Sequence, residues 1–287
     1  MSVFPVFNDV KLDSNNQQTQ ASYYKSAATG DFEGTLDTLA DDVFFEISGD
    51  RSTLPFAGRW EGKEKVKTLF STFGSAFRLL NLTETDIVES ASVSYSFNDE
   101  SFFVYETGIY YRVPVLHIMS FNSDNKISSL VNIHDTSSAY QAFTSSPSSL
   151  IPISPKIAPP SDSSVLDDAY LEDISTSLVK AIFSGETASS LFAENLTFYI
   201  PGLQDRDKIA GVWTLDELKL VYPDRIKKLN KLSSSSSIHS ITKSENRIAI
   251  HGSGGFSSQN PWVILASVDS NKLCSQSSLY FDFQFSL

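Results

Sequence analysis

The chain has 287 residues, of which 41% are hydrophobic and 20% are charged, and its formal net charge at pH 7 is −12. These proportions are those of a globular protein, and the length predicts two domains, with one large domain as the alternative. The acidic balance argues against a nucleic-acid partner and against binding to an anionic membrane, because both require a basic face on the protein.

Cysteine usage and the lack of long apolar runs set expectations for the compartment. Cys274 is the single cysteine, so the chain cannot form an internal disulfide, which suits a reducing compartment. The first residues lack the basic and apolar regions of a signal peptide, and no apolar run approaches the ~20 residues that span a bilayer. We therefore expect a soluble, cytoplasmic protein. The four histidines show no metal-ligand spacing, and neither a metal nor a cofactor is expected.

In the first half, helical patterns come before strand patterns. Residues 1–17 are polar and expected to be irregular, and two short helices separated by a Gly-Asp break follow. Residues 43–47 are aromatic and β-branched and predict a strand. Residues 62–77 carry apolar side chains three or four positions apart, which predicts an amphipathic helix. Short strand-like segments separated by turn residues fill 79–134, and a short helix is expected after Asp135.

The second half repeats this order of elements. Residues 145–164 are rich in serine and proline, which disfavour helix and sheet, and are expected to be a linker. The phrase Ala-Gly-X-Trp before a helix-like run begins at Ala57 and again at Ala210, and the preceding strands match at the same offset. We therefore predict a duplication, with one domain at 18–144 and a divergent copy at 165–287.

Three segments carry a recognisable order in the first half: YYKSAATGDFEGTLDTLADDVFFEI, GRWEGKEKVKTLF and PVLHIMSFNSDNKISSLVNIHD. With them each half, the second more loosely, resembles the superfamily of ketosteroid isomerase, SnoaL and nuclear transport factor 2. The resemblance implies an α+β fold of two tandem cone-shaped domains, each a strongly curved antiparallel sheet wrapped around N-terminal helices. It does not imply one activity, because the superfamily includes isomerases, cyclases, dehydratases, hydrolases and non-enzymes.

The resemblance to ketosteroid isomerase implies two candidate catalytic residues. Tyr23 falls on the tyrosine that donates a hydrogen bond to the developing enolate, and the alternative is an aromatic core residue. His117 falls on the second oxyanion donor, within an otherwise apolar strand, and it could also act as an acid or base. The alternative is a core histidine satisfied by a backbone carbonyl or by Tyr23.

The resemblance to SnoaL-like cyclases and limonene epoxide hydrolase implies a third candidate, Asp135. Strand alternation places Asp135 on the face of Val131 and Ile133, so it would line a pocket if that face is the inner one. The alternative, compatible with the first, is a helix N-cap. Glu106 is a further acid, interpreted either as a pocket acid or as part of a solvated strand face.

The resemblance fails at the catalytic base of the isomerase, where this chain has Ile47, which cannot abstract a proton. The second half is more apolar still, with Leu178, Ile200 and Ile264 at the positions of Tyr23, Ile47 and His117. We therefore expect the second domain to be a structural partner. Domains of this family commonly pair through their sheets, so a tandem copy implies a pseudo-dimer within one chain, or a homodimer of chains.

These observations leave two functional hypotheses. The first is an isomerase, cyclase or hydro-lyase that uses acid/base chemistry on a hydrophobic, carbonyl-bearing small molecule bound in the first domain. The second is a non-catalytic ligand-binding or protein-interaction module. Residues expected to contact the ligand in either case are Phe45, Ile47, Trp60, Tyr105 and Met119.

Overall fold

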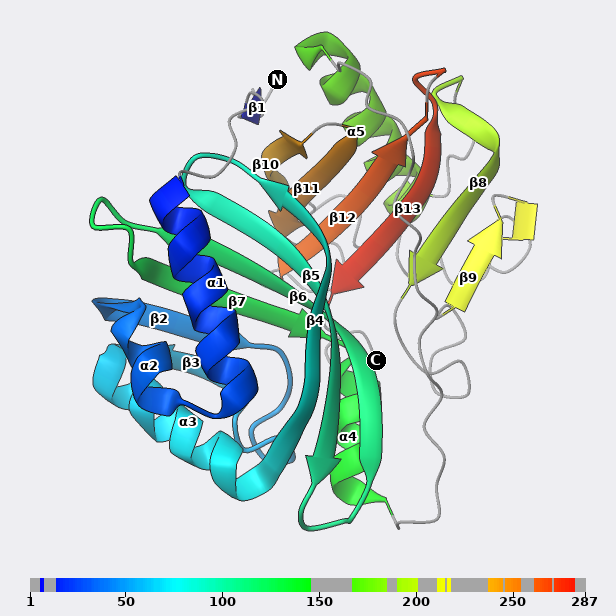
Figure 1. Cartoon of the computed structure of the whole chain (residues 1–287). Coiled ribbons are helices and arrows are strands. Elements are labelled where there is room, and N and C mark those ends of the chain that lie inside the picture. Colours follow the sequence, from blue (N-terminus) through cyan, green and yellow to red (C-terminus); the bar gives the residue numbers. More distant parts are fainter. Residues whose placement is uncertain are drawn as a thin grey trace. The chain divides into compact units, whose positions relative to one another are not determined.

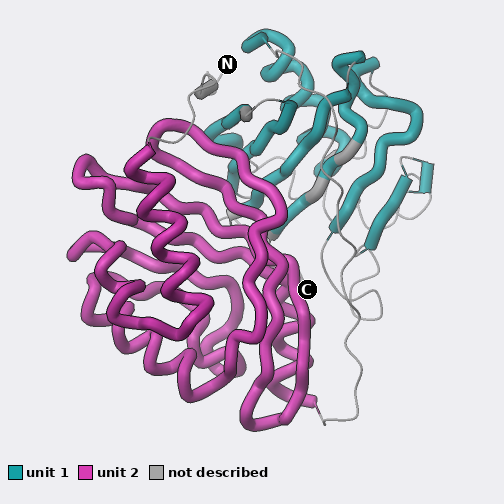
Figure 2. The backbone as a smooth tube through the Cα atoms, in the orientation of Figure 1, with its two compact units in different colours: residues 1–10, 155–287 teal, residues 11–154 magenta. Residues whose placement is uncertain are grey.

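The computed structural model describes residues 6–7, 14–145, 167–184, 190–200, 211–214, 216–217, 237–244, 246–253, 261–269 and 271–281. The chain divides into two compact units, which we call the first domain (residues 11–154) and the second domain (residues 1–10 and 155–287) (Figure 2). Apart from Ser145, the predicted linker lies outside the described residues, as does most of the helix predicted after Trp213. Within the described part, no helix is both long and apolar enough to cross a lipid bilayer.

The first domain combines helices with a six-stranded sheet. Its helices are α1 (Ser14–Thr29), α2 (Phe32–Asp37), α3 (Lys63–Ala76) and α4 (Thr136–Thr144). Its strands are β2 (Leu39–Ile47), β3 (Gly58–Glu61), β4 (Phe77–Glu89), β5 (Val93–Val104), β6 (Tyr110–Phe121) and β7 (Ile127–His134). The strand order is β3-β2-β7-β6-β5-β4, and β2 and β7 form a parallel pair within the otherwise antiparallel sheet.

Helices α1, α2 and α3 cover one face of this sheet, which we call the inner face (Figure 1). Alternate strand positions point toward it, so that Val43, Phe45 and Ile47 of β2 join the hydrophobic core. From helix α3, Val66, Leu69 and Phe70 enter the same core, as their spacing of three or four residues predicts. The core and the cavity described below therefore lie between these helices and the inner face.

The second domain has the same strand order. Its elements are α5 (Asp168–Ser184), β8 (Phe192–Ile200), β9 (Gly211–Thr214), β10 (Ser237–Ser244), β11 (Arg247–Ser253), β12 (Pro261–Val268) and β13 (Cys274–Phe281). They form the order β10-β11-β12-β13-β8-β9, with the parallel pair again at β13 and β8. Trp60 pairs with Phe45 in the first sheet, and Trp213 pairs with Phe198 in the second. The predicted fold class of two tandem α+β domains is confirmed.

The structure differs from the sequence prediction at the N-terminus. Residues 1–17 were expected to be irregular, but β1 (Val6–Phe7) pairs with β10 as an additional parallel strand, and α1 already begins at Ser14. The first turn of α1 is held by polar tertiary contacts, because the buried Asn16 amide donates to the carbonyl of Ala91 at 3.0 Å. Neither the pairing of β1 with β10 nor the hydrogen bond of Asn16 gives a regular spacing of hydrophobic residues, so the sequence pattern did not indicate them.

Candidate functional site

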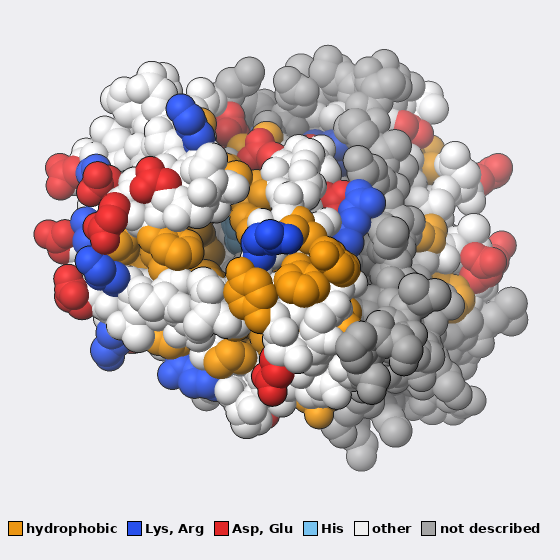
Figure 3. Space-filling model, turned by 60° about the horizontal axis from the view of Figure 1, so that its bottom comes forward, with side chains coloured by type: hydrophobic (Ala, Val, Ile, Leu, Met, Phe, Trp, Pro, Cys, Tyr) orange, Lys and Arg blue, Asp and Glu red, His pale blue; other side chains and the backbone are white. Residues whose placement is uncertain are grey.

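The first domain holds a cavity of about 430 Å³, within the range of roughly 300–1,000 Å³ that small-molecule sites occupy. Its wall is mostly aromatic and aliphatic, including Phe45, Phe56, Phe70, Phe73, Phe102 and Leu130. Arg78 and Tyr105 line the cavity and are also exposed, so they mark its opening. Figure 3 shows hydrophobic side chains gathered around a hollow on one face of the molecule, with a basic side chain beside it.

Two of the three predicted catalytic residues line this cavity. Tyr23 reaches it from α1 and His117 from β6. Tyr23 is not the partner of His117, because the hydroxyl of the next residue, Tyr24, lies 3.2 Å from His117 Nδ1. Burial raises the pKa of Tyr23, so its phenol is a neutral hydrogen-bond donor at pH 7. The chemical role of both residues stays a prediction.

Asp135 does not line the cavity and requires a correction. Its carboxylate caps helix α4, accepting from the backbone N–H groups of Ser137 at 3.0 Å and Ser138 at 3.2 Å, and from both serine hydroxyls. The face of β7 that lines the cavity carries Asn132 and His134, not the residues in phase with Asp135. Strand alternation therefore directs Asp135 away from the pocket, and the cap is the role that the structure shows.

Among the predicted ligand-binding residues, Phe45, Ile47 and Tyr105 line the cavity, whereas Trp60 and Met119 do not. The indole N–H of Trp60 donates to the carbonyl of Phe56 at 2.9 Å, which fits a framework role. Met119 shares the inner face with His117 but is fully buried in the core. Glu106 is exposed in the turn between β5 and β6, and it is not among the lining residues.

The sequence interpretation missed the acid that does line the cavity. Glu100 of β5 is 5% exposed, and burial, assisted by the charge of Asp99, raises its pKa to about 8. Its Oε1 atom has no hydrogen-bond partner among the residues that the structure describes. Alternation along Ser96-Asn98-Glu100-Phe102, all buried, is the signal that could have identified it.

Glu100 stands beside His117, with 3.7 Å between Oε1 and Nε2. Burial, assisted by His134, lowers the pKa of His117 to about 3, and burial lowers the pKa of His134 to about 4. At pH 7 Glu100 is therefore mostly protonated and both histidines are neutral, so the 3.7 Å contact is not an ion pair.

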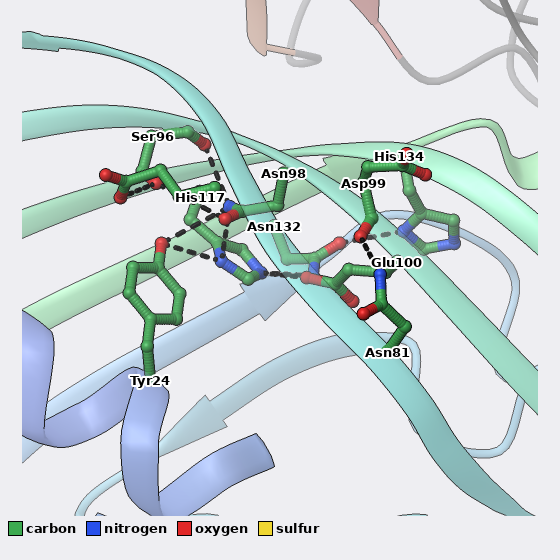
Figure 4. Close-up of polar contacts among 10 residues, drawn as sticks. Tyr24, Asn81, Ser96, Asn98, Asp99, Glu100, His117, Asn132 and His134 are labelled. Atoms are coloured by element: carbon green, nitrogen blue, oxygen red, sulfur yellow. Dashed lines mark hydrogen bonds and ion pairs between the residues drawn. The ribbon is translucent and has the colours of Figure 1, made fainter.

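Hydrogen bonds join these groups into one buried network (Figure 4). Asn132 bridges the two histidines. Its Nδ2 atom lies 2.9 Å from His117 Nε2, and its Oδ1 atom lies 2.8 Å from His134 Nδ1. The Asn98 amide nitrogen lies 3.2 Å from His117 Nδ1. His134 Nε2 is buried and has no hydrogen-bond partner in the described part of the chain. The cavity thus combines an apolar wall with a neutral polar region that contains two unpaired atoms.

Three described positions of the second domain can be compared with this polar region. Leu178, Ile200 and Ile264, which match Tyr23, Ile47 and His117, are all buried in its hydrophobic core. This agrees with the apolar character that the sequence predicts for these positions.

The cap at Asp135 leads to a first test. Asp135→Ala is expected to lower the free energy of unfolding by about 1–2 kcal/mol, because helix α4 loses its N-terminal acceptor. Asp135→Asn keeps an acceptor oxygen and should stay within about 0.5 kcal/mol of the wild-type protein in urea denaturation. If Asp135 were instead a reacting acid, Asp135→Asn would keep stability and abolish turnover.

A scan of protein-family models and a search of curated proteins find no match to the chain. Solved structures do match. An NTF2-like protein of unknown function from Burkholderia pseudomallei is 20% identical with a TM-score of 0.43, over 46% of this chain and 99% of its own. An NTF2-like protein from Burkholderia xenovorans is 18% identical with a TM-score of 0.41, over 45% and 96%. TerC, co-crystallized with polyporic acid, is 18% identical with a TM-score of 0.42, over 46% and 100%.

Each of these three structures matches less than half of this chain. Similarity at this identity does not carry an activity from one chain to another.

Proposed function

We propose that the first domain binds a hydrophobic small molecule that carries a carbonyl group, and that it transfers a proton on that molecule as an isomerase or cyclase does. The observation that carries this proposal is the position of Glu100, a buried carboxyl group with an unpaired oxygen in the polar region of a mostly apolar cavity. A buried polar atom without a partner costs free energy, so a ligand oxygen beside it is stabilising.

The cavity wall supports an apolar ligand body. Aromatic residues from α3 and from both halves of the sheet surround the space, among them Phe45, Phe70 and Phe102. Transfer of apolar surface from water to such a wall contributes roughly 25 cal/mol per Å². The ligand is therefore expected to be held mainly by its hydrocarbon or aromatic part.

The polar region supports acid/base chemistry on a carbonyl group. The Tyr23 phenol and the protonated Glu100 carboxyl group are neutral donors that stabilise an oxygen on which negative charge develops. The fraction of Glu100 that is ionised near neutral pH takes the proton from the carbon next to the carbonyl group, and Tyr23 alone then donates to the developing enolate oxygen. Ile47 lines the cavity at the position of the isomerase base, so the proton would move through Glu100 and not along the isomerase route.

The second candidate is a binding module without catalysis. It is favoured by Ile47 and by the lowered pKa values of His117 and His134, which make both imidazoles weak bases. In either case the second domain would act as a structural partner, paired with the first in a pseudo-dimer.

Binding of ketone-bearing steroids, polyketides and terpenoids, measured by calorimetry, tests the proposal. Tyr23→Phe should weaken a bound ketone about tenfold, because it removes a hydrogen bond worth about 1–1.5 kcal/mol. Glu100→Gln keeps an N–H donor at the same place, so it should bind the ketone nearly as the wild-type protein does. Tyr110→Phe and Glu46→Gln are matched controls, since neither residue lines the cavity, and both should bind as the wild-type protein does.

Turnover is read separately, by deuterium exchange at the carbon next to the ketone in D₂O. Exchange that is lost in Glu100→Gln supports the enzyme. Binding without exchange across the panel selects the binding module, and no binding by any member contradicts the proposal.

A further inference from the structure

Glu100 is poorly placed to exchange its proton with water directly. The residue is 5% exposed and its Oε1 atom is buried. At pH 7 the carboxyl group is mostly protonated, since burial, assisted by the charge of Asp99, raises its pKa to about 8. It must release this proton before it can act as a base, and a ligand that fills the cavity covers it further. A route for the proton through the protein would meet this need.

The imidazole of His117 is placed to be the first step of such a route. Its Nε2 atom lies 3.7 Å from Glu100 Oε1, and hydrogen bonds at catalytic sites are often long until a ligand binds. Its Nδ1 atom, on the other side of the ring, lies 3.2 Å from the hydroxyl of Tyr24. An imidazole takes up a proton at one nitrogen while it releases one from the other, so this ring connects Glu100 to Tyr24.

Beyond Tyr24 the polar groups lead to the protein surface. Burial raises the pKa of Tyr24 well above its usual value, whereas hydrogen bonds with Ser96 and Asn98 act against this rise. The Ser96 hydroxyl donates to Glu84 Oε2 at 2.6 Å. Glu84 is an exposed residue of β4, and the same oxygen accepts from the Gln20 amide of α1 at 3.1 Å, which holds the carboxylate beside Ser96. Groups that bind and release protons therefore extend from the cavity to solvent.

We propose that a proton relay connects the cavity to solvent through Glu100, His117, Tyr24, Ser96 and Glu84 (Figure 4). Outward, Glu100 gives its proton to His117 Nε2, and His117 releases the proton of Nδ1 to the Tyr24 oxygen. Tyr24 passes its hydroxyl proton to the Ser96 oxygen, and Ser96 passes its own to the Glu84 carboxylate. The role of the relay in catalysis rests on the proposed function, whereas the relay itself does not.

These steps balance without leaving a charge inside the protein. Glu100 ends ionised and Glu84 protonated, and the three residues between them keep their number of protons. His117 is left with its proton on Nε2, and this tautomer carries the next proton inward by the reverse steps. Burial, assisted by His134, lowers the pKa of His117 to about 3, so the imidazolium is not populated at pH 7 and the transfers are linked. Removal of one hydroxyl should therefore interrupt the whole relay.

Infrared spectroscopy of the ligand-free protein tests the relay without a substrate. After mixing into D₂O at pH 6, the band of the protonated Glu100 carboxyl group shifts as COOH becomes COOD, and the band is assigned by its loss in Glu100→Gln. We expect this exchange to be about tenfold slower, or more, in Tyr24→Phe and in Ser96→Ala, because each removes a hydroxyl that passes the proton on.

Ser94→Ala is the matched control. Ser94 and Ser96 lie on the same face of β5, and both are completely buried. The Ser94 hydroxyl has no hydrogen-bond partner among the described residues and is not part of the relay. This variant should exchange at the wild-type rate. Equal rates in Ser94→Ala and Ser96→Ala would overturn the relay, whether both are slowed or neither is.

Glu84→Gln tests the outer end of the relay. Glutamine keeps an acceptor for Ser96 but takes up no proton, so exchange at Glu100 should be slower than in the wild-type protein. Glu89→Gln is the control, because Glu89 is another acid of β4 that accepts from a glutamine of α1, Gln17, at 3.1 Å. An unchanged rate in Glu84→Gln would show that the proton leaves elsewhere, which contradicts the relay as proposed.

A steroid 3-ketone probes the catalytic role. Deuterium entry at the carbon next to the ketone should be about tenfold slower in Ser96→Ala, while the affinity for the ketone stays at the wild-type value, since Ser96 does not line the cavity. An unchanged rate, or a loss of affinity that explains the slower rate, contradicts this role. No deuterium entry in the wild-type protein refutes the proposed catalysis, and the infrared measurement then still decides the relay.

Discussion

Replacing Glu100 with glutamine is expected to stabilise the first domain above pH 7 and to remove a loss of stability that the wild-type protein shows as pH rises. The pKa of this carboxyl group is raised from 4.5 to about 8 in the folded protein. Between these values the unfolded chain has released the proton and the folded chain still holds it. The unfolded state therefore binds fewer protons, and the free energy of unfolding falls with pH by up to about 1.4 kcal/mol per unit.

Summed over this window, the loss for the wild-type protein is on the order of 3–5 kcal/mol, and it is absent in Glu100→Gln because an amide does not ionise. Hydrogen exchange of peptides from β5 to β7 at pH 5 to 9, corrected for the intrinsic exchange rate, reads this domain separately. Glu46→Gln, on a residue that does not line the cavity, should keep the wild-type slope. Parallel profiles for Glu100→Gln and the wild-type protein would show that Glu100 is ionised when folded.

Local patterns were sufficient to predict most of the fold. Helix α3 occupies Lys63–Ala76, within the predicted range, because its apolar period and the glycine before it are both local signals. The repeated Ala-Gly-X-Trp phrase placed Trp60 and Trp213 at equivalent positions, and each pairs with the equivalent phenylalanine. Strand β1 and the parallel pair of β2 and β7 could not be predicted in this way, because they depend on partners far away in the sequence.

The candidate site was harder to predict because strand periodicity does not say which face is inner. In β7, Leu130 lines the cavity while Ile133, on the opposite face, is also buried. Both faces are therefore apolar, and a choice shifted by one residue selects Asp135 instead of His134. Glu100 was missed for a related reason, since an acid in an alternating strand is ordinarily taken to be on a solvated face.

The sequence repeat nevertheless identified positions at which the two domains carry side chains of different polarity. Leu178, Ile200 and Ile264 pack in the core of the second domain, whereas two of their three counterparts in the first domain, Tyr23 and His117, are polar residues that line the cavity. The proposed acid/base chemistry therefore concerns the first domain, and variants that change proton binding there are expected to leave the second domain unchanged.

The two buried histidines are expected to decide how far the stability of the first domain falls at acidic pH. The pKa values of His117 and His134 are lowered from 6.5 to about 3 and about 4. Their contribution to stability is complete above about pH 6.5 and is lost as pH falls, because the unfolded chain binds two protons that the folded chain excludes. Above pH 4.5 the folded state also holds a proton on Glu100 that the unfolded state has released. Between about pH 4.5 and 6.5 the unfolded state therefore binds one proton more than the folded state, and the free energy of unfolding rises with pH by the amount expected for one proton.

The wild-type first domain should therefore be most stable near pH 6.5 and lose about 3 kcal/mol by pH 4, whereas Glu100→Gln should lose about 5–6 kcal/mol over the same range. His134→Gln should reduce the slope by one proton whatever its effect on the absolute stability, since slope and level are measured independently. His251→Gln is the matched control, because the pKa of His251 in the second domain is also lowered to about 4 by burial. That variant should change the acid profile of peptides from β11 and leave those from β7 unchanged. A wild-type slope in His134→Gln would mean that His134 is protonated in the folded protein.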